Sequence, residues 1–121
     1  MALARPFHLV SANNTTPILV GAETRLTGYD LTNANAAVVY VKLFWVDGAT
    51  PPTVGTTVPD YVIACTPTGA ATPANRLTMT SPIFKRGVLY VAVTTGRLDS
   101  DNTAGAANDI LGTLHVEGGV A

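Results

Sequence analysis

The sequence predicts a single all-β domain, an antiparallel β-sandwich of the jelly-roll or Greek-key type. Its 121 residues suffice for one buried core. Val and Thr are abundant, and Gly and Pro separate short apolar segments, which is typical of short strands joined by turns. No stretch has the sustained 3.6-residue periodicity of a helix. Two segments are apolar on both faces, and two stacked sheets are the economical way to cover them.

Four strands are predicted in the N-terminal half, at 7–11, 18–20, 23–32 and 37–46. The third alternates loosely, which places Leu26 and Leu31 on opposite faces. An Asn-rich turn at 32–35 leads into the fourth strand, because Asn side chains bond readily to their own backbone. The fourth strand is apolar on both faces except for Lys42, as in a central strand that is covered on two sides.

Four more strands are predicted in the C-terminal half, at 61–65, 76–80, 87–95 and 110–117. Alternation in the first of these directs Tyr61 and Cys65 to one face. In the second, alternation directs Leu77 and Met79 inward. The one segment in which we expect a short helical turn is 103–111.

The segments outside the strands offer candidate contact surfaces. Because proline cannot donate to a strand ladder, the segment 49–59, with three prolines, is expected to form an ordered loop or an extended edge. Residues 1–6 are a candidate N-terminal arm of the single domain 1–121. The side chains that we expect at an interface are Arg5, Pro6, Pro51, Pro52 and Val54.

Charge and hydropathy argue against two classes of partner. The net charge is −1 and the charges are scattered, so no basic stripe is available for nucleic acid. No apolar run approaches the roughly 20 residues of a membrane span. The N-terminus also lacks the apolar core of a signal peptide, so we expect synthesis in a cytoplasm. Only 12% of the residues are charged, which suggests that a partner covers part of the surface.

No catalytic set is predicted. His8 and His115 have no second His, Cys or paired carboxylate at ligand spacing, so both are expected to be ordinary imidazoles. The single cysteine, Cys65, excludes an internal disulfide and is expected in the core as a small apolar residue. We therefore predict a protein that is not an enzyme.

No cofactor is predicted either. If a metal binds, calcium at Asp99 and Asp101 is the candidate, but the EF-hand pattern fails there and a solvated loop tip is the favoured interpretation. Asn13 and Asn14 match the glycosylation motif, which matters only in a secreted chain, and we interpret them as a polar turn.

Aromatic residues lie mainly inside the predicted strands, where a core position is favoured over a subunit interface. They are Tyr40, Phe44, Trp45, Tyr61 and Tyr90.

Three segments, in this order, resemble small virion proteins of tailed bacteriophages. They are Thr32-Asn33-Ala34-Asn35-Ala36-Ala37 leading into Tyr40-Val41-Lys42-Leu43-Phe44, the Pro-rich loop 49–59, and the C-terminal run 87–96 followed by Asp99-Ser100-Asp101 and Ala106-Ala107-Asn108-Asp109-Ile110. The resemblance spans about residues 26–117. The chain departs from it at Val38-Val39, where such proteins often have Ala-Arg, and in its longer segment 66–75.

The resemblance implies a capsid decoration (cement) protein on the virion surface, with no catalytic residue and no cofactor. Its partner would be the major capsid protein, and it would form a homo-oligomer, with a trimer expected ahead of a dimer. Two alternatives stay open: another virion component, such as a head–tail or tail/fibre-associated protein, and a β-sandwich carbohydrate-binding module. The module is less favoured because the aromatic residues lie in apolar strands rather than in loops.

Overall fold

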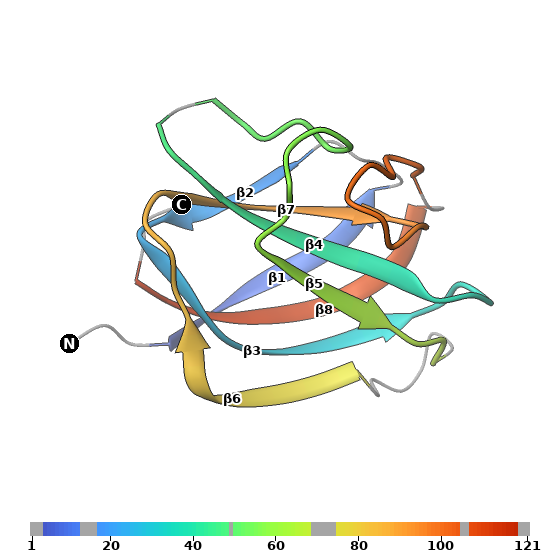
Figure 1. Cartoon of the computed structure of the whole chain (residues 1–121). Coiled ribbons are helices and arrows are strands. Elements are labelled where there is room, and N and C mark those ends of the chain that lie inside the picture. The colour runs from blue at the N-terminus through green and yellow to red at the C-terminus, as the bar shows by residue number, and fades with distance from the viewer. Residues whose placement is uncertain (1–3, 13–16, 49, 69–74, 105–106, 119–121) are drawn as a thin grey trace.

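Eight antiparallel strands form two four-stranded sheets that face each other (Figure 1). The computed structural model describes residues 4–12, 17–48, 50–68, 75–104 and 107–118. The strands are β1 (Ala4–Ala12), β2 (Ile18–Ala22), β3 (Thr24–Asn33), β4 (Val39–Val46), β5 (Tyr61–Cys65), β6 (Asn75–Ile83), β7 (Val88–Thr94) and β8 (Ala107–Gly118). The described residues contain no helix that could cross a membrane.

The strand order identifies the topology. Sheet A has the order β1-β8-β3-β6, and sheet B has the order β2-β7-β4-β5. The antiparallel pairs are therefore first with last, second with seventh, third with sixth and fourth with fifth. This nested pairing is that of a jelly roll. The predicted fold class, an antiparallel β-sandwich, is confirmed.

All eight predicted strands are found, and two expectations at the ends of strands fail. β8 begins at Ala107, so the helical turn expected within 103–111 is wrong. The ladder to β3 already includes the pair Asn33–Ile110, and Ile110 is fully buried. Residues 4–6 of the expected arm lie in β1 and pair with β8, whereas residues 1–3 lie outside the described residues.

The main core lies between the two sheets and is built from the inward side chains of both. Leu26 and Leu31 are both fully buried there, so the prediction that they face opposite ways is wrong. The reason is a register shift between Leu26 and Gly28, where Thr27 is an extra residue that reverses the alternation.

The β6 strand is less buried than its alternation predicts. Met79 packs against the core, whereas Leu77 lies opposite the core residue Tyr29, on the inward side as predicted, but is 40% exposed. β6 is the edge strand of sheet A and bends sharply in Figure 1, where its register with β3 shifts between the pairs Gly28–Thr78 and Leu26–Ile83. Beyond this bend, Ile83 pairs with Leu26 and still packs against the core, so the exposure of Leu77 reflects its place at the edge of the sheet.

A second, smaller core covers the outer face of sheet B. Phe44, Tyr90 and Ala92 point outward from β4 and β7 and pack against Val54. The segment that carries Val54 passes in front of sheet B in Figure 1. The prediction that β4 is covered on both faces is confirmed.

The Asn-rich turn before β4 is held by side chains, as predicted. Asn33 is buried, and its Oδ1 accepts a hydrogen bond of 2.9 Å from the backbone N–H of Asn35. Its Nδ2 donates to the carbonyls of Ala37 and Cys65, at 3.0 and 2.7 Å. This one side chain therefore connects β3, the turn and the end of β5.

Candidate functional site

The residues expected at an interface do not all face outward. Pro51 is exposed and Pro52 is buried, while Val54 packs against the outer face of sheet B and holds the loop to it. Pro6 is exposed and lies opposite His115 in the β1–β8 ladder, and Arg5 lies opposite Val116. Within the Pro-rich loop, Val58 is the large apolar side chain that faces solvent, with 65% of its surface exposed.

The loop between β7 and β8 is anchored by a buried ammonium group. Lys42 is almost completely buried, and its Nζ donates to the carbonyls of Leu98 and Asp101, at 2.7 and 3.1 Å. Burial lowers the pKa of Lys42, and the nearby carboxylates of Asp101 and Asp99 oppose this shift. The Lys42 ammonium thus supplies the positive charge inside this loop.

The calcium candidate is organised around that ammonium. Asp101 Oδ1 accepts a hydrogen bond of 2.8 Å from the N–H of Thr103, and Asp99 is exposed. In the part of the chain that the structure describes, no three His, Cys, Asp or Glu side chains gather as a metal site would require. The Asp101 carboxylate therefore holds the loop through Thr103, while Lys42 holds it through two backbone carbonyls.

The residues considered for catalysis do not meet as a reactive set. His8 and His115 are both exposed on the outer face of sheet A, with His8 opposite Thr113 and His115 opposite Pro6. Cys65 is fully buried, as predicted, and burial raises the pKa of its thiol to about 12. A thiolate nucleophile is therefore disfavoured at neutral pH.

The outer face of sheet A carries a shallow polar hollow of about 350 Å³ near Gly28. Asp30 and Arg76 lie on its floor and form an ion pair, with Arg76 Nη2 3.1 Å from Asp30 Oδ2. The other carboxylate oxygen, Oδ1, is buried and has no hydrogen-bond partner among the described residues. Arg76 pairs with this carboxylate, and His115 also lines the hollow.

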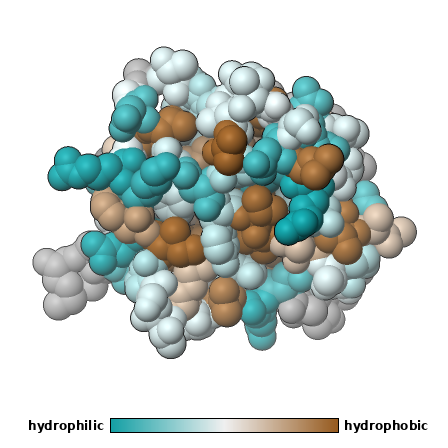
Figure 2. Space-filling view, in the orientation of Figure 1, coloured by the Kyte–Doolittle hydropathy of each residue, from teal (hydrophilic) through white to brown (hydrophobic). Residues whose placement is uncertain are grey.

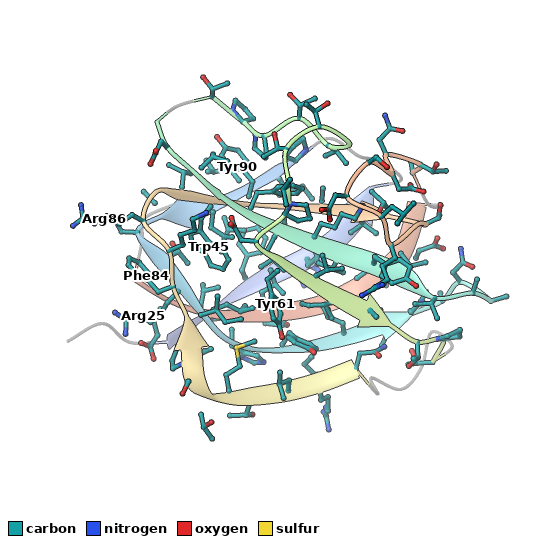
Figure 3. The ribbon with its side chains drawn as sticks, viewed as in Figure 1. Arg25, Trp45, Tyr61, Phe84, Arg86 and Tyr90 are labelled. Carbon is teal, nitrogen blue, oxygen red and sulfur yellow. The ribbon has the colours of Figure 1, made fainter. Side chains whose placement is uncertain are left out.

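A more distinctive surface lies at one end of the sandwich. We call Arg25, Phe84 and Arg86 the end patch; Figure 3 shows these side chains on the same side of the molecule. Phe84 is 46% exposed and is the one exposed aromatic side chain among the described residues. The guanidinium of Arg25 lies 5.6 Å from the centre of its ring, within range of a cation–π contact.

The turn that carries Phe84 is held at both ends. The Lys85 ammonium lies 2.7 Å from Asp60 Oδ1, and Gly87 exchanges hydrogen bonds with the backbone and side chain of Glu23. Glu23 has a φ of 48°, a left-handed conformation that is uncommon without glycine. At Gly87, with a φ of 115°, a Cβ atom would lie 2.4 Å from the carbonyl of Val46. The strained backbone at Glu23 and several hydrogen bonds therefore fix the turn that carries the exposed Phe84.

Sequence reasoning missed the end patch. The basic pair Lys85-Arg86 was its one visible signal, but Arg25 is distant in sequence and reaches Phe84 only in the folded chain. Asn13 and Asn14, the glycosylation candidates, lie outside the described residues.

No protein-family model, no curated protein and no solved structure matches this chain.

Proposed function

We propose that this chain is a non-enzymatic structural protein of a tailed-bacteriophage virion, in its simplest form a capsid decoration protein that binds the shell of the major capsid protein. The end patch is the observation that carries the proposal. An exposed aromatic ring in contact with one arginine, with a second arginine on the same side, has the composition of a binding hot spot. Because the turn is already fixed, little conformational entropy would be lost on docking.

The resemblance to small virion proteins supplies the identity of the partner. The segments that carry it have structural roles here: the Asn-rich turn is bonded by Asn33, and the Pro-rich loop packs on sheet B. These segments would build the scaffold, and the end patch would provide the contact. That division is expected of a protein that binds many equivalent sites on a rigid lattice, where each contact can be modest.

The jelly roll alone does not distinguish this proposal from a carbohydrate-binding module, because viral capsid domains and lectins share that architecture. The placement of the aromatic residues favours the virion role. Phe44, Trp45 and Tyr90 are buried, so none of them offers a ring for stacking on a sugar. Figure 2 shows the apolar side chains on the face in view in small separate groups.

The copy number in particles tests the role directly. Quantitative mass spectrometry on gradient-purified particles of the phage that encodes the chain should find copies comparable to those of the major capsid protein. A few copies per particle would instead assign the chain to the tail or a vertex. Absence from particles would overturn the virion role and favour the carbohydrate-binding alternative.

A binding assay tests the surface separately. Phe84→Ser should weaken binding to shells that lack this protein by about 30-fold, the loss expected at a hot spot of about 2 kcal/mol. Val58→Ser is the matched control, because it removes an exposed apolar side chain from the Pro-rich loop. If Val58→Ser weakens binding and Phe84→Ser does not, the contact lies on the Pro-rich loop and the end patch is the wrong surface.

A further inference from the structure

The β5 strand has an edge with which no described strand pairs; the next residue, Thr66, is hydrogen-bonded through its backbone to the side chain of Asn75 in β6. β5 is the last strand of sheet B, bonded to β4 on one side, and no described strand pairs with its other side. An edge strand presents unpaired N–H and C=O groups, which proteins normally protect with charges, prolines or bulges. β5 has the sequence Tyr-Val-Ile-Ala-Cys, without a charge or a proline, and its register with β4 is unbroken.

The other three edge strands carry such protection. β1 contains Arg5 and Pro6. β2 has a register shift between Leu19 and Gly21, and β6 contains Arg76 and Pro82 besides its sharp bend. Edge-to-edge association is therefore discouraged at β1, β2 and β6, and it is left open at β5.

Two hollows flank β5, one on each of its faces. On the inner face, a groove of about 310 Å³ lies between Tyr61 and the β6 residues from Leu77 to Ile83. On the outer face, a hollow of about 250 Å³ lies between Val62 and Leu98, with the charged residues Arg97 and Asp99 also in its lining. Figure 3 shows Tyr61 at the near side of the molecule, on the open side of the sandwich.

Exposed apolar side chains stand beside both hollows. Leu98, next to the outer hollow, is 70% exposed, and Leu77, next to the inner groove, is 40% exposed. An uncharged edge between two hollows is the geometry of strand addition, in which backbone hydrogen bonds provide affinity and alternate side chains enter pockets on either face.

We propose that the β5 edge pairs with a second copy of this chain, β5 against β5 in antiparallel orientation about a two-fold axis. The strand that fits the site is β5 itself. It is apolar on both faces, so the partner's copy would place its inward residues over the groove at Leu77 and its outward residues beside Leu98. Because β5 has no charge, no like charges meet at the axis.

This pairing stops at two copies. A two-fold contact uses the same surface on both partners. The β5 edge of each copy is therefore occupied in the dimer and cannot bind a third copy. The joined sheet of eight strands would end in β2 on both sides, and that edge is irregular. A trimer, which the sequence resemblance favours, cannot be built from this contact. The inference depends only on the edges of the sheets and is independent of the proposed virion role.

Sedimentation analysis of the purified chain between about 1 and 100 μM tests the pairing. The wild-type chain should be a dimer at the upper end of this range. Ala64→Lys, at an exposed outward position of β5, should raise the dissociation constant at least about 100-fold, because it places like charges near the axis. Leu19→Lys, at an exposed position on the opposite edge of sheet B, is the matched control and should remain dimeric.

Leu98→Ser is a second test that leaves β5 unchanged. It removes an exposed side chain beside the outer hollow, so it should weaken the dimer by about tenfold without affecting folding. A wild-type chain that stays monomeric at 100 μM, or that forms a trimer, would overturn the proposal. So would a dimer that survives Ala64→Lys, or one that is lost in Leu19→Lys instead.

Discussion

The outer face of sheet B is covered by loops, whereas the outer face of sheet A is exposed to solvent. On sheet B, Phe44 and Tyr90 are buried beneath the Pro-rich loop, and Lys42 is buried beneath the β7–β8 loop. On sheet A, the corresponding face carries Asp30, Arg76, Thr78 and His115, and a shallow hollow opens above Gly28. Sheet B is thus the middle layer of a three-layer structure, whereas sheet A meets solvent on its outer side.

The difference shows that the long loops of this chain are structural. The Pro-rich loop supplies Val54 to a second core, and the β7–β8 loop supplies two carbonyls to a buried ammonium. A jelly roll with short loops would leave the apolar outer face of sheet B exposed to water. Among the described residues, the surfaces left exposed include the end patch, the edge of β5 and the outer face of sheet A.

The largest expected effect comes from breaking the second core. Phe44→Ala should lower the free energy of unfolding by about 3–5 kcal/mol, because it leaves a cavity beneath the loop. His115→Ala, on the open face of sheet A, should change it by less than about 0.5 kcal/mol. Urea unfolding of both variants measures the two changes in the free energy of unfolding. Equal decreases would mean that Phe44 is no better covered than His115.

The next effect concerns the anchor of the β7–β8 loop. Lys42→Met keeps the aliphatic chain but leaves the carbonyls of Leu98 and Asp101 without their donor. The expected cost is about 1–3 kcal/mol. Hydrogen exchange should accelerate in the segment 95–104 and stay unchanged in β3. If the loop amides keep their protection, the ammonium is not what holds the loop.

A pH titration of stability tests how well Cys65 is buried on the inner side of sheet B. The pKa of Cys65 is raised from 9.0 to about 12 in the folded chain, so the unfolded chain releases the thiol proton first as pH rises. Stability is then complete below pH 9 and falls toward pH 12, with a loss of about 1.4 kcal/mol at pH 10. Urea unfolding at pH 8 and pH 10 should show this loss in the wild-type chain and a smaller one in Cys65→Ala. Equal losses would mean that the thiol is accessible to water.

The smallest effect is expected on the open face. Arg76 is exposed, and its ion pair with Asp30 is screened by solvent. Arg76→Ala should therefore leave the midpoint of urea unfolding unchanged within the error of the titration, at both low and high salt. A clear shift that disappears in high salt would show that this face contributes more than its exposure suggests.

Local patterns in the sequence determined most of the architecture. Alternating and two-sided apolar segments predict the strands and their stacking in two sheets, and β5 was predicted with its observed bounds, Tyr61–Cys65. The coverage of β4 and the burial of Cys65 also follow from such patterns. These properties depend on neighbouring residues within one strand, so a reader of the sequence alone can find them.

Contacts between distant residues decided the rest. The extra residue at Thr27 reverses the alternation of β3 because of its ladders to β6 and β8, and Leu77 is exposed because β6 is an edge strand. The loop anchor joins residues 56 positions apart, from Lys42 to Leu98. The end patch likewise joins the start of β3 to the turn before β7. No local period encodes such pairings, because their energy comes from burial and hydrogen bonding that exist only once the two sheets and their loops have assembled.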